Sequence, residues 1–155
     1  MKPVPITKQG YEILKKELAR LKSVERPANI RAIEEARAHG DLSENAEFSA
    51  AKERQSLIDA RLRELEYKLG NAEVIDPDTL SKDRALFGSR VVLENLDTGD
   101  EVTYQLVGPD ESDIKSGRIS IGSPLGRAML GKVIGDEIVI NAPGGKREYE
   151  LVEIL

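Results

Sequence analysis

The sequence contains no cysteine, no tryptophan and a single histidine, His39, among its 155 residues. Without cysteine the chain forms neither a disulfide nor a thiolate metal site, which is typical of proteins from a reducing compartment. No second histidine or cysteine accompanies His39, so a metal site built on this residue is not expected. The serines lack the elbow motif of hydrolases, and a nucleophilic triad is therefore excluded as well.

Long apolar runs and an excess of basic residues are also missing. No stretch approaches the roughly 18 apolar residues of a membrane span, and residues 1–6 lack the apolar region of a secretion signal, so we expect a cytoplasmic protein without a membrane partner. The net charge of −5 divides unevenly: residues 1–75 hold 14 Lys+Arg against 13 Asp+Glu, and residues 76–155 hold 9 against 15. Neither half has the basic surface needed to neutralise many phosphates, although a local basic stripe is compatible with these numbers.

Two stretches carry apolar residues at the 3-4 spacing of a helical seam. The first stripe consists of Tyr11, Leu14, Leu18 and Leu21, and the second of Phe48, Ala51, Ile58, Leu62, Leu65 and Leu69, with Gln55 as its one polar member. The pattern predicts helices from about Lys8 to Arg37, with Thr7 as N-cap, and from about Leu42 to Leu69. Pro27 falls inside the first helix and predicts a kink or break there. Each helix buries its stripe against the other, which predicts an antiparallel coiled-coil hairpin.

Between the two stripes lies a short turn that carries acidic residues. Gly40 suits the left-handed residue that ends a helix. Asp41 followed by Glu44 matches a capping box at the start of the next helix, in which each side chain satisfies a backbone donor. A second interpretation is that two carboxylates at the end of a long arm help to hold a hard cation such as Mg²⁺. Because Mg²⁺ prefers six oxygen ligands, a partner's carboxylates, a phosphate or waters would have to supply the others.

After a polar segment at residues 76–84, which we interpret as a linker, the apolar period changes from that of a helix to that of strands. Strands are predicted at residues 89–96, 101–107, 118–121, 137–141 and 147–155. Ser123 as N-cap and Pro124 at the first position predict a short helix that ends near residue 130. The Pro-Gly-Gly sequence before the last strand indicates a hairpin turn and not a phosphate-binding loop, because it leads from strand to strand. The fold class is therefore α+β, with a helical hairpin at residues 1–75 and a small sheet domain at 85–155.

The turn also carries a family resemblance. Residues 35–48, EARAHGDLSENAEF, resemble the tip of the bacterial transcript cleavage factors of the GreA/GreB family. Residues 71–76 resemble the junction between the two domains of that family, residues 119–132 its C-terminal signature, and residues 143–145 its last hairpin. The resemblance covers nearly the whole chain without large gaps, and it is closer to GreA than to GreB members, whose arm is typically richer in basic residues.

The resemblance implies both a fold and a mechanism. Members of this family have an antiparallel coiled coil and an FKBP-like domain, predicted here as an antiparallel sheet with a short helix. The FKBP-like domain docks on the rim of the RNA polymerase secondary channel, and the coiled coil enters the channel. When the polymerase has backtracked, the tip acids stabilise a second Mg²⁺ and its attacking water, which stimulates the polymerase to cleave the nascent RNA near its 3′ end. On this sequence those acids are Asp41 and Glu44.

The same resemblance gives expectations for other residues and for partners. Arg37 and Lys52 match a small basic patch that contacts extruded RNA, although Lys52 is equally compatible with a solvated helix surface. Ser123 and Pro124 match a loop that faces the polymerase, and Phe48 matches an aromatic position whose place on the seam favours packing. We expect a monomer that has no active site of its own and binds no Mg²⁺ without polymerase.

Two other functions remain open on the sequence alone. Inhibitory relatives of the family keep its architecture, but they carry extra acids at the tip that this chain lacks. The FKBP-like fold would also suit a prolyl isomerase, but the pocket of such enzymes is lined by aromatic residues around a tryptophan floor, and fold alone does not carry function. The absence of tryptophan and the few aromatic residues of the second half, Phe87, Tyr104 and Tyr149, argue against it.

Overall fold

The computed structural model describes residues 3–40 and 45–155. The chain forms two compact units, one comprising Met1–Val4 and Tyr11–Ala72, the other Pro5–Gly10 and Glu73–Leu155. A short N-terminal segment, Pro5–Gly10, therefore belongs with the second unit. The domain ranges predicted from sequence placed this segment in the helical hairpin. Its main anchor is the Glu111 carboxylate, which accepts hydrogen bonds from the Thr7 hydroxyl and, at 3.3 Å, from the Thr7 amide.

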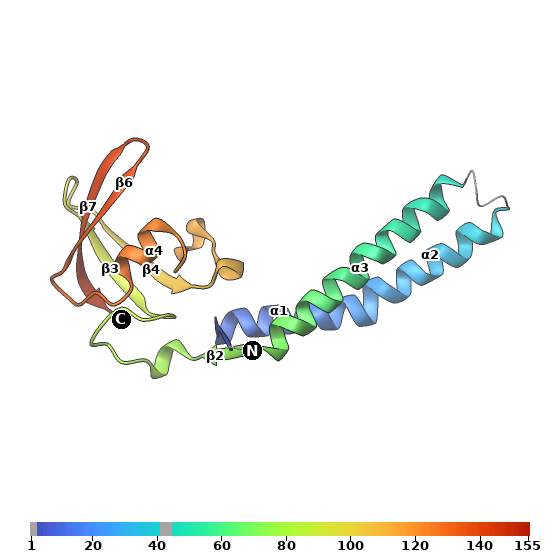
Figure 1. The fold of residues 1–155 in the computed structure, drawn as a ribbon, viewed down its shortest axis with the longest axis horizontal. Coiled ribbons are helices and arrows are strands. Elements are labelled where there is room, and N and C mark those ends of the chain that lie inside the picture. The colour runs from blue at the N-terminus through green and yellow to red at the C-terminus, as the bar shows by residue number, and fades with distance from the viewer. Residues whose placement is uncertain (1–2, 41–44) are drawn as a thin grey trace. The chain divides into compact units, whose positions relative to one another are not determined.

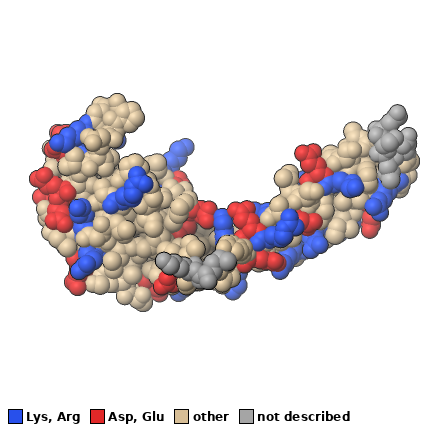
Figure 2. All heavy atoms as spheres, viewed as in Figure 1, with Lys and Arg blue, Asp and Glu red and all other residues tan. Residues whose placement is uncertain are grey.

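The first unit contains the predicted helical hairpin, in which α2 and α3 lie side by side (Figure 1). Its helices are α1 (Lys8–Arg20), α2 (Arg26–Ala38) and α3 (Ala46–Gly70). The predicted N-cap is confirmed, because Thr7 Oγ1 accepts a hydrogen bond from the Gly10 amide at 3.1 Å. Basic and acidic side chains are interspersed along this unit (Figure 2), as expected for a solvated helical surface.

The irregularity predicted at Pro27 is a π-helical turn, Leu21–Glu25, that joins α1 to α2 without ending the helical path. Pro27 has no amide hydrogen, so the carbonyl of Ser23 loses its usual partner at that position. The amide of Arg26 instead donates to the carbonyl of Leu21, which is the bonding pattern of a π-helix. The proline thus shifts the register of the seam and does not interrupt the helical path from α1 to α2.

The second helix of the hairpin begins later than predicted. It starts at Ala46, with Asn45 as its N-cap, and not near Leu42. The predicted start near Leu42 is therefore wrong, and the N-cap of α3 is Asn45. Asp41 and Glu44, for which a capping box was one of two interpretations, lie outside the described residues. The predicted end is confirmed, since α3 finishes at Gly70 with Asn71 as C-cap. Gly40 has a φ of +109°, which confirms the positive-φ residue expected after α2.

The seam is apolar along most of its length, but it contains a buried polar contact. Buried hydrophobic side chains on it are Leu14, Ala36, Ala51, Ile58, Leu62 and Leu65. Asn29, only 4 % exposed, donates from Nδ2 to the carbonyl of Ala51 at 2.8 Å and to Gln55 Oε1 at 2.9 Å. Farther along, Arg61 donates two hydrogen bonds to Glu17, at 2.6 and 2.8 Å. These contacts fix the two helices in one register.

The second unit is built on a five-stranded sheet of order β5-β4-β3-β7-β6. Its strands are β3 (Arg90–Asn95), β4 (Glu101–Val107), β5 (Arg118–Ser120), β6 (Glu137–Ala142) and β7 (Gly145–Ile154), and helix α4 spans Pro124–Met129. Its core consists of Ala85, Val91, Leu93, Leu106, Ile119, Met129, Ile138, Tyr149, Leu151 and Ile154. A separate two-stranded sheet pairs β1 (Val4–Thr7) with β2 (Ala72–Ile75).

The α+β fold class is confirmed, with one difference in the sheet. The pairs β3–β4, β3–β7 and β6–β7 are antiparallel as predicted, but β5 pairs parallel with β4. Two short 3₁₀ turns, Pro109–Glu111 and Ile114–Ser116, carry the chain back so that it runs again in the direction of β4. The sheet is therefore mixed. Among the described residues no helix is both long and apolar enough to cross a membrane.

Candidate functional site

The end of α2 and the start of α3 are tied together by one side chain, Asn45. Its Oδ1 accepts a hydrogen bond from the amide of Phe48 at 3.0 Å and caps α3. Its Nδ2 donates to the carbonyl of Ala36 at 2.7 Å, and Ala36 is 2 % exposed. Asn45 thus satisfies groups on both helices at the position where the chain turns. Asp41 and Glu44, the predicted metal ligands, lie outside the described residues.

The structure brings the two predicted basic residues together around one aromatic ring. Arg37 Cζ lies 5.8 Å from the centroid of the Phe48 ring, and Lys52 Nζ lies 5.4 Å from it. Arg37 comes from the last turn of α2, whereas Phe48 and Lys52 stand one turn apart on α3. Phe48 is half-buried, while both cationic side chains are exposed. The sequence assigned Phe48 mainly to packing, but its ring also contacts both charges.

Charged residues of both signs surround this cluster. Nearby, His39 Nδ1 lies 4.0 Å from Glu47 Oε2, with both side chains exposed. Within residues 3–40 and 45–155 the salt bridges include neither Arg37 nor Lys52. Among the same residues no group of three or more histidine or acidic side chains is arranged to hold a metal ion. Among the described residues Arg37 and Lys52 are therefore two exposed cations without a carboxylate partner, and each can contact an anion such as a phosphate.

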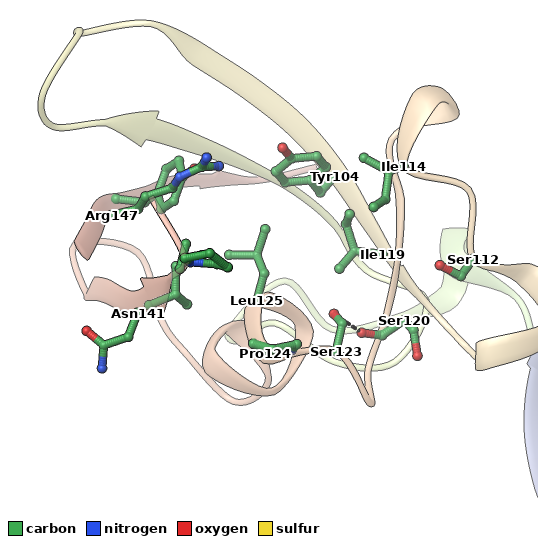
Figure 3. Close-up of a pocket in the computed structure, with 14 residues that line it drawn as sticks. Tyr104, Ser112, Ile114, Ile119, Ser120, Ser123, Pro124, Leu125, Asn141 and Arg147 are labelled. Carbon is green, nitrogen blue, oxygen red and sulfur yellow. Dashed lines mark hydrogen bonds between the residues drawn. The ribbon is translucent and has the colours of Figure 1, made fainter. Parts of the chain in front are cut away.

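The second candidate region is the loop that leads from β5 into α4. Ser123 Oγ accepts a hydrogen bond from the Gly126 amide at 3.1 Å and donates one to the Ser120 carbonyl at 2.7 Å (Figure 3). The predicted N-cap is therefore confirmed, and Pro124 occupies the first turn with an exposed ring. A Cβ added to Gly126 would overlap the Ser120 carbonyl oxygen and lie 2.8 Å from its carbon. The loop is thus closely packed and holds Pro124 at the surface.

A pocket of about 340 Å³ adjoins this loop. Its lining includes Tyr104, Ile119, Leu125, Ile140, Arg147 and Tyr149 (Figure 3). Burial raises the pKa of the Tyr104 phenol above its ordinary value. Two tyrosines and several aliphatic side chains form the walls, in place of the tryptophan-floored aromatic lining on which an isomerase depends. Polar side chains, among them Ser112, Asn141 and Arg147, complete the lining.

Comparison with known proteins identifies the family. A family model described as "Transcription elongation factor, N-terminal" matches residues 4–74, and one described as "Transcription elongation factor, GreA/GreB, C-term" matches residues 80–155. The chain belongs to the GreA/GreB family of transcription elongation factors. The match extends over both compact units, so it covers the hairpin with its basic cluster as well as the loop at Ser123.

Individual members of the GreA/GreB family are similar over their full length. Transcription elongation factor GreA of Alkalilimnicola ehrlichii is 54 % identical over 155 residues, which covers 99 % of this chain and 98 % of that protein. The GreA of Ralstonia nicotianae is 58 % identical over 152 residues and covers 97 % and 96 %. Among solved structures, GreA factor homolog 1 (Gfh1) of Thermus thermophilus is 31 % identical over 99 % of both chains, with a TM-score of 0.45.

Sequence reasoning missed Asn45 and Asn29, the two asparagines that join the helices. A signal for Asn45 was present, since asparagine is a favoured N-cap, but the Asp41–Glu44 spacing matched the capping box and was preferred. Asn29 lies outside the apolar stripe and faces Gln55, the one polar member of the opposite stripe. A polar pair across a seam has no local spacing signal and becomes visible only when the helices are aligned.

Proposed function

We propose that this protein binds RNA polymerase as a monomer, enters its secondary channel with the helical hairpin, and stimulates cleavage of backtracked nascent RNA. In this role Asp41 and Glu44 supply ligands to a Mg²⁺ of the polymerase active site. Membership of the GreA/GreB family supports the polymerase partner. The observation that supports a metal-ligand role for the two acids is the N-cap of α3. Because Asn45 caps this helix, the helix does not require Asp41 and Glu44 for its start.

The donor set fits a shared metal ion and not a metal bound by this protein alone. Two carboxylates offer hard oxygen ligands, which Mg²⁺ prefers, but they fill only part of an octahedral shell. The polymerase, the RNA phosphate and water would complete it, so the active site belongs to the polymerase and this chain has none of its own. A second metal ion at such a site favours attack of water on the phosphodiester.

The described residues have separate tasks in this proposal. Arg37 and Lys52 contact phosphates of the extruded RNA 3′ segment and keep it beside the acids, since both are exposed cations at the same end of the hairpin. Ser123 and Pro124 form part of the surface that docks on the rim of the channel. The tight hydrogen bonding of Ser123 supports a rigid docking loop.

The experiment uses polymerase halted in a backtracked complex with labelled RNA. Wild-type protein is compared with Asp41→Asn and Glu44→Gln, which remove a negative charge without a large change of shape. We expect the wild type to accelerate shortening of the RNA and both variants to bind polymerase yet lose most of the stimulation. Unchanged stimulation by both variants would refute the metal-ligand role, and suppression of cleavage by the wild type would identify an inhibitor.

A further inference from the structure

We propose that Phe48 is a positioning residue that holds Arg37 and Lys52 as a two-cation clamp for phosphates of a single RNA strand. This inference rests on the proposed function, and it adds a task for a side chain that the sequence assigned to packing. The clamp consists of Arg37, Phe48 and Lys52, with the guanidinium carbon 5.8 Å and the ammonium nitrogen 5.4 Å from the ring centroid.

The ring can hold both cations because its face is electronegative. A cation within about 6 Å of an aromatic centroid is attracted to the ring quadrupole, and both charges of the clamp satisfy that distance. Lysine and arginine side chains otherwise lose much rotamer freedom when they bind an anion. Two cations that already rest against one ring lose less, so the clamp is preorganised for the backbone of the RNA.

Several basic residues of the hairpin are instead paired with acids. Four arginines elsewhere on it, Arg20, Arg26, Arg54 and Arg61, each lie within salt-bridge distance of a carboxylate. A carboxylate would also orient a cation, but it would cancel its charge. Phe48 orients Arg37 and Lys52 and is itself neutral, and within the described part of the chain neither cation lies within salt-bridge distance of a carboxylate.

Phe48→Leu and Phe48→Tyr separate this role from packing. Leucine fills an apolar seam position but has no aromatic face, whereas tyrosine keeps the ring. In the backtracked cleavage assay we expect Phe48→Leu to slow RNA shortening about two- to fivefold for each cation released, and Phe48→Tyr to act as wild type. Ile58→Val is the matched control, because it loosens the same seam away from the clamp and should leave cleavage unchanged.

A double-mutant comparison shows whether the ring acts through the cations. In a chain that already carries Arg37→Gln and Lys52→Gln, Phe48→Leu should cause no further loss. NMR of the free protein adds a readout independent of cleavage: the methylene protons next to Lys52 Nζ should show a ring-current shift that disappears in Phe48→Leu and persists in Phe48→Tyr.

Several outcomes would overturn the clamp. An equal loss from Phe48→Leu with and without the two cations would assign the ring to packing alone. Absence of the ring-current shift in the wild type would show that Lys52 does not rest on the ring. An active wild type with an equally active Phe48→Leu would refute this inference and leave the proposed function intact, whereas a wild type that stimulates no cleavage would refute both.

Discussion

Asn45 performs two tasks at the residue scale that an acidic side chain cannot combine. Its carbonyl oxygen caps α3, and its amide nitrogen donates to the Ala36 carbonyl on α2. Aspartate is an equally good cap, but its ionised carboxylate has no hydrogen to donate. The choice of asparagine therefore secures the helix start and the closure of the hairpin together, and it leaves neighbouring acids available for other chemistry.

Substitution of Asn45 separates these tasks. Asn45→Ala removes both and should lower the free energy of unfolding by about 1–2 kcal/mol, because the Phe48 amide loses its acceptor and the Ala36 carbonyl loses one of its two donors, keeping the His39 amide. Asn45→Asp keeps the cap and should cost less than Asn45→Ala. Denaturant unfolding followed by helical circular dichroism measures both. Equal stability of Asn45→Ala and wild type would show that this side chain does not hold the turn.

At the element scale, an ion pair between α1 and α3 makes the hairpin sensitive to acid. Hydrogen bonds from Arg61 hold the pKa of the Glu17 carboxyl below its usual range. A carboxyl whose pKa is lowered by folding stabilises the folded state above its unfolded pKa, and this contribution is lost as the pH falls through the folded pKa. The stabilisation of Glu17 is therefore present at neutral pH and absent in strong acid.

Glu17→Gln tests this contribution directly. Because both side chains of the pair are 36 % exposed, solvent screening limits the expected loss at pH 7 to about 0.5–1 kcal/mol. The difference from wild type should shrink as the pH falls below the ordinary Glu17 value of 4.5. Glu66→Gln is the control, since its pairing with Lys22 is more exposed and should matter less. A loss that does not change with pH would contradict an ionic origin.

The β5–α4 loop provides a second prediction at this scale. Gly126→Ala places a Cβ against the Ser120 carbonyl and should destabilise the second unit by more than about 2 kcal/mol, because backbone would have to move. Gly144→Ala is the matched control, since nothing lies within 4 Å of its added Cβ. Thermal unfolding of both variants measures the effect. Equal melting temperatures would show that the loop can relax. They would contradict the claim that this loop holds Pro124 rigidly at the surface.

The sequence predicted the long helices well, but it misplaced the start of α3 and missed the direction of β5. The long helices follow from apolar spacing, which is local information, and the predicted ends at Thr7 and Gly70 are confirmed. The start of α3 was misplaced because two caps compete in the sequence, and the contact of Asn45 with α2 favours the later one. The parallel pairing of β5 was missed because a three-residue strand carries no signal for its direction.

At the scale of the whole molecule, the family was predicted from resemblance and not from the chemistry of the residues. The residues alone left Asp41 and Glu44 as either a cap or part of a metal site, and two acids do not define a Mg²⁺ site without a partner. The family match over both units supports the polymerase as that partner. The resemblance predicted Arg37 and Lys52 as one basic patch, but the place of the Phe48 ring beside both was not predictable, because Arg37 reaches the ring from the other helix.

The Mg²⁺ dependence of RNA cleavage is the most direct test of the central claim that this chain lends metal ligands to the polymerase. Cleavage of a backtracked complex is measured over a range of Mg²⁺ concentrations with wild-type protein and with Asp41→Asn, at saturating amounts of each. We predict that the variant needs a higher Mg²⁺ concentration for half-maximal cleavage, because one anionic ligand is lost, and that added Mg²⁺ restores part of the rate. An identical Mg²⁺ dependence for both proteins would contradict the account.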